Sequence, residues 1–335
     1  LQPVTVGVLN DALLETAETV KLSLGSVTGP GATAGAQTAH DVTITDDEAA
    51  AGVTVEFELA ASSVAEAAVN HTVNVRLVTA AGVTLAPGVS VTAVVSDLGT
   101  GTATSGSDYT AFLPTTVTFG PGSGDGALQP VTVGVLNDAL LETAETVKLS
   151  LGSVTGPGAT AGAQTAHDVT ITDDEAAAGV TVEFELTASS VAEAAVNHTV
   201  NVKLVTAAGV TLAPGVSVTA VVSDLGTGTA TSGSDYTAFS PTTVTFSGGA
   251  GNGALQPVTV GVLNDALLET AETVKLSLGS VTGPGATAGA QTAHDVTITD
   301  DEAAAGVTVE FELAASSVAE AAVNHTVNVK LVTAA

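Results

Sequence analysis

Acidic side chains that could bind a cation are concentrated between the strand-like segments of this sequence. They include Glu66, Asp108, Asp138 and Glu142, together with the run Asp173-Asp174-Glu175. Carboxylate oxygens on loops are the ligands that hard divalent cations prefer. If several of them converged, they would repel one another and have raised pKa values unless a cation neutralised them. The pattern therefore indicates a candidate cation site, and the alternative is that these loops are solvated surface.

The overall charge fits a partner for cations and argues against anionic partners. The chain has 335 residues, with 6 Lys+Arg against 35 Asp+Glu and a formal net charge of −29. This balance argues against nucleic-acid backbones and anionic membrane surfaces as partners. The absence of Cys removes disulfides, thiolate metal sites and Cys nucleophiles. No apolar run approaches the ~18 residues of a membrane span, so we expect no membrane insertion.

A repeat of 127 residues organises the chain. The segment that begins at Leu1 returns from Leu128 and again from Leu255. Residues 49–175 and 176–302 differ from each other at only seven positions. A period this long corresponds to a whole domain rather than a solenoid turn. We therefore expect complete domains at 49–175 and 176–302, the C-terminal part of a repeat at 1–48, and the N-terminal part of another at 303–335.

Apolar and polar residues alternate with period two in seven segments of each repeat, which is typical of half-buried strands. With only nine aromatic residues, Val, Ala, Thr and Gly must build the core. Seven short strands punctuated by Gly and Pro predict an all-β, two-sheet antiparallel sandwich. Residues 62–68 and 138–145 have helix-permissive composition, and we expect at most a single turn in each. In the first complete repeat the expected strands are 53–59, 72–77, 89–96, 115–119, 131–136, 146–151 and 168–172.

Three motifs resemble a known domain family. Thr102-Ala103-Thr104-Ser105-Gly106-Ser107-Asp108-Tyr109 is similar to the "GTA…GxDY" signature of Calx-β domains. The segment from Val133 to Asp138, with Glu142 and Glu145, is similar to the family's "D…E..E" loop. Val169-Thr170-Ile171-Thr172-Asp173-Asp174-Glu175 matches the acidic end of its last strand. The resemblance runs through the whole repeat and implies tandem seven-stranded immunoglobulin-like sandwiches.

The same resemblance implies Ca²⁺ as the bound ion, at one end of each sandwich. Where the family can have two adjacent acids, this chain has Asn137-Asp138, with one charge fewer. Glu145 and Glu175 are secondary candidates, and we expect Glu145 to hydrogen-bond loop backbone rather than a metal. The implied ligands are Glu66, Asp108, Asp138, Glu142, Asp173 and Asp174, and in the second repeat Glu193, Asp235, Asp265, Glu269, Asp300 and Asp301.

Other chemistry finds little support in the sequence. His71 and His167 are nearly a hundred residues apart, so a transition-metal site would need them to converge with further ligands. The sequon at Asn70 lies at the head of a strand, and we expect it to be unmodified. No nucleophile motif or phosphate-binding loop is present. Asp138 and Glu142 could suggest a glycosidase pair, but the repeat lacks the aromatic residues of a sugar cleft. We expect no enzymatic activity.

The tandem organisation favours a mechanical role. Near-identical units with few Lys and Arg and no Cys or Met resemble large bacterial adhesins and matrix proteins. We expect an extended, Ca²⁺-rigidified stalk or fibre, extracellular or on the cell surface, that contacts neighbouring repeats and other copies of itself. One alternative is a regulatory Ca²⁺ sensor, and another is a passive spacer that self-assembles through strand contacts. Segments 53–59 and 131–136 are the candidate edge strands for such contacts. A substrate-binding region of a secreted hydrolase is a further rival, without a visible aromatic platform.

Overall fold

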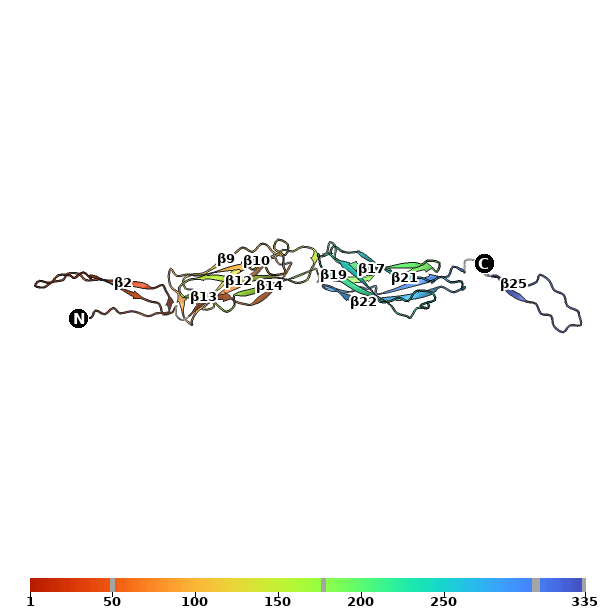
Figure 1. Ribbon diagram of the computed structural model, residues 1–335, viewed down its shortest axis with the longest axis horizontal. Coiled ribbons are helices and arrows are strands. Elements are labelled where there is room, and N and C mark those ends of the chain that lie inside the picture. The colour runs from red at the N-terminus through yellow and green to blue at the C-terminus, as the bar shows by residue number, and fades with distance from the viewer. Residues whose placement is uncertain (49–51, 176–178, 303–307, 333–335) are drawn as a thin grey trace. The chain divides into compact units, whose positions relative to one another are not determined.

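A computed structural model describes the chain except residues 49–51, 176–178, 303–307 and 333–335. It divides into two compact units, each a β-sandwich (Figure 1). Unit 1 comprises residues 1–138 and 144–173, and unit 2 comprises 139–143 and 174–335. Five residues that precede the second sequence repeat therefore belong to unit 2. Among the described residues, no helix has the length and apolar character needed to cross a membrane.

Each unit is built on a four-stranded and a five-stranded sheet. In unit 1 the first sheet has the order β10 (Leu128–Gly134), β6 (Asn70–Val78), β4 (Val53–Phe57), β13 (Ala159–Ala161). The second has the order β5 (Ala61–Ala65), β14 (Ala166–Thr172), β12 (Glu145–Thr155), β8 (Val91–Asp97), β9 (Thr115–Phe119).

Unit 2 repeats this topology. Its four-stranded sheet has the order β21 (Leu255–Gly261), β17 (Asn197–Val205), β15 (Val180–Phe184), β23 (Ala286–Ala288). Its five-stranded sheet has the order β16 (Ala188–Ala192), β24 (Ala293–Thr299), β22 (Glu272–Thr282), β19 (Ser217–Asp224), β20 (Thr242–Ser247). Both units are all-β sandwiches, as the sequence predicts.

All seven predicted strands are present in both repeats, but further strands depart from the predicted antiparallel pattern. β5 and β13 both pair in parallel, with β14 and β4 respectively. Residues 62–68 stay within the expected limit of one turn, because β5 occupies their first part and a single hydrogen-bonded turn follows it. The prediction that 53–59 is an edge was wrong, because β13 covers that side of β4. β10 does lie at an edge, which tolerates Pro130 because an edge strand has one unpaired side.

The alternation of apolar and polar residues along each strand explains which side chains form the core. Val53, Val55 and Phe57 on β4 are buried and alternate with partly exposed Thr54 and Glu56. The other strands bury one face in the same way, so a single apolar cluster fills each sandwich. The core of unit 1 also includes Leu14, from the two-residue strand β1 (Leu13–Leu14). β1 pairs in parallel with β7 (Thr84–Leu85).

Apart from β1, the described residues of each incomplete repeat form one hairpin. Residues 1–48 contribute β2 (Glu18–Ser23) and β3 (Ala39–Ile44), and residues 303–335 contribute β25 (Thr308–Phe311) and β26 (Val329–Val332). Phe311 is 66% exposed, whereas the same residue of the complete repeats, Phe57 or Phe184, is buried. An isolated hairpin cannot bury such a residue, because the opposing sheet is missing.

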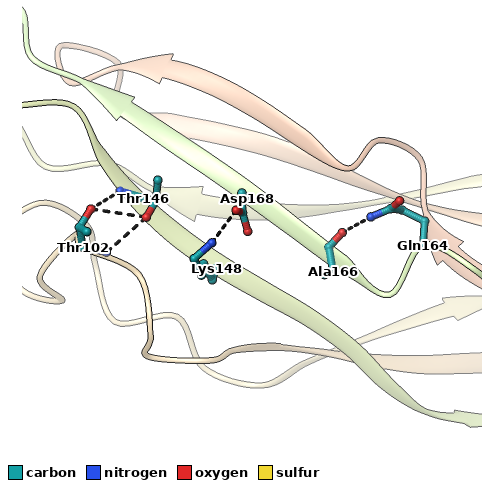
Figure 2. A network of polar contacts seen from close by, with 6 residues as sticks. All are labelled: Thr102, Thr146, Lys148, Gln164, Ala166 and Asp168. Carbon is teal, nitrogen blue, oxygen red and sulfur yellow. Dashed lines mark hydrogen bonds and ion pairs between the residues drawn. The ribbon is translucent and has the colours of Figure 1, made fainter.

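The loop that follows β8 is held in place by close packing against the backbone of β12. Figure 2 shows Thr102, in this loop, beside Thr146 on β12; the Thr146 N–H donates to Thr102 Oγ1 at 2.9 Å. The Ala103 N–H donates to the Thr146 carbonyl at 3.0 Å. A Cβ atom on Gly101 would overlap this carbonyl, so only Gly allows the approach. Farther along the same sheet face, Lys148 pairs with Asp168 at 2.6 Å, and Gln164 bonds to the Ala166 carbonyl (Figure 2).

We predict that Gly101→Ala lowers the free energy of unfolding of unit 1 by about 1–3 kcal/mol, because the new methyl group must displace backbone. Calorimetry of the full chain should show an earlier transition for unit 1 and an unchanged one for unit 2. The control is Gly120→Ser: a Cβ meets nothing there, and the second repeat has Ser247 at the same position. Equal melting of both variants would contradict the role of Gly101.

Candidate metal centre

The first carboxylate group of unit 2 comes from three chain segments. Asp235 lies in the loop between β19 and β20, Glu269 in the loop between β21 and β22, and Glu272 is the first residue of β22. One carboxylate oxygen from each lies within 4.8 Å of the others. Side chains alternate between the two faces of a strand, so Glu272 lies on the same face of β22 as the buried Val274 and Leu276. Its side chain therefore points into the sandwich.

The second group is assembled by a parallel strand pair. β16 runs beside β24, with Ala192 opposite Thr299, so both strands end at the same edge. Glu193 directly follows β16, and its N–H donates to the Thr299 carbonyl at 2.8 Å. Asp301 and Glu302 follow β24. Oxygens of Glu193, Asp301 and Glu302 lie within 4.8 Å of one another.

The loop between β21 and β22 is tied to the second group by backbone hydrogen bonds. The Asp265 N–H donates to Glu193 Oε1 at 2.9 Å, and the Glu269 N–H donates to Asp300 Oδ1 at 3.2 Å. Asp265 Oδ1 accepts the Leu267 N–H at 2.7 Å. Asp265 and Asp300 lie outside the two groups, and the structure shows them holding the loop.

The Asp-Tyr motif anchors the loop that carries Asp235. Asp235 is buried, and its Oδ2 accepts the Thr231 N–H. The Tyr236 hydroxyl donates to Asp224 Oδ2 at 2.7 Å, at the end of β19. Burial, followed by this hydrogen bond, raises the pKa of Tyr236 to about 12. The tyrosine therefore stays protonated and fixes the loop, while the aspartate faces the other acids.

Unit 1 gathers a similar but not identical set, in which Asp173, the counterpart of Asp300, takes the place that Asp301 has in unit 2. Asp108 lies within 4.8 Å of Glu145, and Glu66 lies within the same distance of Asp173. The Asp138 N–H donates to Glu66 Oε1 at 3.0 Å, as Asp265 does in unit 2. Three other predicted ligands or secondary candidates of the first repeat, Glu142, Asp174 and Glu175, belong to the residues that form unit 2.

The carboxylate groups raise one another's pKa in the absence of a cation. Burial is the largest cause of the raised pKa of Glu193, Glu269 and Glu302, followed or accompanied by neighbouring negative charges. The pKa of Glu272 is raised to about 7, first by burial and then by a hydrogen bond with Asp235. Such a bond between two acids needs a proton, which a bound cation would replace.

The donor chemistry fits a hard cation. Glu272 Oε2, Asp301 Oδ1 and Glu302 Oε2 are buried and have no hydrogen-bond partner within the described part of the chain. Both groups offer oxygen only, which suits Ca²⁺ rather than a transition metal. All six Lys and Arg residues of the chain are already paired with acids of the strands. A bound cation would therefore supply the counter-charge that the protein's own basic residues place elsewhere.

The histidines do converge, but on a serine. His71 Nε2 and His167 Nε2 each lie 2.7 Å from Ser62 Oγ, and His167 Nδ1 lies 2.7 Å from the Leu59 carbonyl. Among the described residues, neither histidine joins a group of potential metal ligands. This contact links β5, β6 and β14, and the sequence spacing gave no sign of it.

Comparison with known proteins identifies the domain type. The family model described as Calx-beta domain matches residues 48–175 and 174–302. The chain belongs to the Calx-beta domain family. This is a family of domains and not a class of enzyme. None of the curated proteins compared with this Calx-beta chain matches it.

Several solved structures are similar to this Calx-beta chain in fold. The CBD12 structure from CALX1.2 is 18% identical, covering 73% of this chain and 99% of that one, with a TM-score of 0.33. Apo-form Calx CBD1 is 24% identical, covering 36% and 97%, with a TM-score of 0.30. The structure described as calcium binding domain CBD12 of CALX1.1 is 17% identical, covering 72% and 98%, with a TM-score of 0.31.

We predict that the metal-free protein loses stability as the pH rises from 6.5 to 8.5. The pKa of Glu272 is raised from 4.5 to about 7, so its contribution is present at low pH and lost as pH rises through about 7. Thermal melting in excess chelator should show a midpoint that falls by about 3–5 °C for unit 2. Glu272→Gln should flatten this dependence, because glutamine carries no proton to lose.

Exposed Glu185 provides the control for this experiment. Its Oε2 accepts a hydrogen bond from Asn201 on the outer face, away from both groups, so Glu185→Gln should retain the wild-type pH dependence. An identical pH dependence in wild type and Glu272→Gln would contradict the shared proton.

Proposed function

We propose that each Calx-beta repeat binds Ca²⁺ through its loop carboxylates, and that the repeats form the extended part of a large bacterial protein outside the cell. The observation that carries the Ca²⁺ proposal is the set of buried, unpartnered oxygens on Glu272, Asp301 and Glu302. Leaving such atoms unsatisfied costs free energy, which coordination of a cation would recover. The description of a solved relative as a calcium binding domain agrees with this proposal.

Each of the two carboxylate groups of unit 2 would bind one ion. Asp235, Glu269 and Glu272 would bind one ion, and Glu193, Asp301 and Glu302 another. Ca²⁺ supplies charge neutralisation and accepts six to eight oxygens, so backbone carbonyls and water would complete each shell. Asp265 and Asp300 would position the loop between the two groups through the backbone hydrogen bonds already described. Because ion binding requires the folded arrangement, Ca²⁺ stabilises it by mass action.

The mechanical part of the proposal rests on the repeat. The two complete repeats differ at only seven of 127 positions. Near-identical tandem copies favour an array whose role is to extend the protein, whereas a sensor needs only one or two domains coupled to an effector. A net charge of −29 makes the metal-free chain self-repelling, and Ca²⁺ would relieve this repulsion most strongly at the acidic loops. The millimolar Ca²⁺ expected outside a cell is the setting in which such sites remain filled.

We predict that Glu272→Gln weakens Ca²⁺ binding to unit 2 by roughly ten- to a hundredfold while unit 1 keeps its sites. Isothermal titration of the full chain should therefore lose part of its stoichiometry rather than all of it. Mg²⁺, which demands a tighter octahedral shell, should give a much smaller thermal shift than Ca²⁺.

Asp125→Asn is the matched control for the titration. Asp125 Oδ1 accepts the Thr79 N–H at 3.3 Å, and Asn252 Oδ1 accepts the Thr206 N–H at the same distance in the second repeat. Removing this charge should leave Ca²⁺ binding unchanged. A wild-type chain with no Ca²⁺-specific heat and no thermal shift would contradict the proposal and leave a passive spacer.

We predict that Ca²⁺ changes the solution dimensions of the full chain. Small-angle scattering should give a narrower distribution of maximum dimensions in millimolar Ca²⁺ than in EGTA, because bound ions order the acidic loops where the chain passes between repeats. Unchanged scattering together with Ca²⁺ binding by titration would contradict the stiffening role and leave the ion site intact.

A further inference from the structure

A short leucine-bearing segment completes the core of unit 2. The strand β11 (Leu140–Leu141) pairs in parallel with β18 (Thr211–Leu212). The Thr211 N–H donates to the Ala139 carbonyl at 3.1 Å, and the Ala213 N–H donates to the Leu141 carbonyl at 3.1 Å. The side chain of Leu141 is fully buried in the hydrophobic cluster of unit 2. In the sequence, this segment lies one repeat before the strands that it completes.

Unit 1 has the same arrangement. Leu14 of β1 is fully buried in the core, beside β7. The Thr84 N–H donates to the Ala12 carbonyl at 3.2 Å, and the Ala86 N–H donates to the Leu14 carbonyl at 3.1 Å. The sequence Asp-Ala-Leu-Leu-Glu-Thr is identical in the two cases. We call each copy of this hexapeptide the leucine strap, at residues 11–16, 138–143 and 265–270.

The third leucine strap is exposed. Leu267 and Leu268 are 61% and 50% exposed, and neither lies in a strand. Its six residues are the same as in the other two copies, so intrinsic preference does not explain the difference. The first two straps each pair with a Thr-Leu-Ala segment, at 84–86 and 211–213, whereas among the described residues no strand pairs with the third.

The edge that receives a strap is built for one strand. Leu212 is held on its other side by the Gly-rich hairpin, because its N–H donates to the Ala250 carbonyl at 2.8 Å and its carbonyl accepts the Gly249 N–H at 2.7 Å. The N–H groups of Thr211 and Ala213 point the other way, to the strap. Main-chain bonds supply affinity and the leucine pocket supplies selectivity, as in other cases of strand addition.

We propose that the leucine strap is a docking strand whose partner is the Thr-Leu-Ala edge of another copy of this repeat, and that Leu267 and Leu268 form an open docking site of this kind. The stable folding unit is then a sandwich together with the strap from the preceding repeat. Each internal repeat both receives a strap and supplies one. The interlock itself consists of main-chain hydrogen bonds and a buried leucine and involves no ion, although the hexapeptide also carries Asp265 and Glu269, and Glu269 belongs to the first carboxylate group.

The three identical straps supply a matched mutational test in the full chain. Leu141→Ala should lower the melting midpoint of unit 2 by roughly 10 °C, because it opens a cavity in a packed core. Leu14→Ala should do the same to unit 1. Leu268→Ala, the same change in the same hexapeptide, should shift neither unit by more than about 1 °C. Hydrogen exchange resolves the units, and Leu141→Ala should expose the amides of Thr211 and Ala213.

A lengthened chain distinguishes docking from a local effect. When one further copy of residues 176–302 is joined after residue 302, Leu268→Ala should become as destabilising as Leu141→Ala, and the loss should fall in the added copy. The melting measurements are made both in Ca²⁺ and in EGTA, so strap docking can be tested even if the protein binds no ion. Equal effects of Leu14→Ala, Leu141→Ala and Leu268→Ala in the present chain, or a neutral Leu268→Ala in the longer one, would overturn the proposal.

Discussion

The distribution of positive charge constrains the acidic end of each sandwich. All six basic residues pair with acids borne by the strands, such as Lys275 with Asp295 at 2.8 Å. The acids that follow β16 and β24, and those of the loop before β22, therefore face one another. Their mutual repulsion is moderated by backbone N–H groups, such as that of Asp265, which donates to Glu193. An arrangement of this kind is stable as apo protein only at a cost, which a cation would remove.

Much of the fold follows from local pattern, and the rest depends on contacts across long sequence separations. Strict alternation located β4 and β22 because one face of each strand is buried. β5 escaped prediction because Ala-Ser-Ser-Val-Ala has little strand preference of its own, and its pairing with β14 lies over a hundred residues away. The convergence of His71 and His167 on Ser62 depends on that same pairing, so it was equally hidden.

The candidate site, like the fold, could be predicted from the sequence only in part. The Asp-Tyr motif and the acidic end of the last strand predict Asp235 and Asp301, and the family resemblance implies Glu193; the structure places each of the three in a carboxylate group. Glu145, the counterpart of Glu272, was only a secondary candidate, although the spacing of Glu272 from the buried Val274 and Leu276 places it on the inward face of β22. The different positions of Asp265 and Asp300 could not be read from residue type, because an aspartate can equally coordinate a metal or accept a backbone N–H. The two repeats illustrate this, since Asp173 joins a carboxylate group in the first and its counterpart Asp300 does not in the second.

The leucine strap contributes strongly to stability because valine dominates the core. Each sandwich has few large buried side chains, and Leu141 is one of them, so removing it would leave a cavity that Val and Ala cannot fill by rearrangement. The strap also contains Asp138 and Glu142, two of the carboxylates implied as ligands. This loop therefore contributes in two ways: its acidic residues would bind the cation, and its central leucine is buried in the core. In a long array these requirements would make the stability of each repeat depend on its neighbour, as in a one-dimensional cooperative chain.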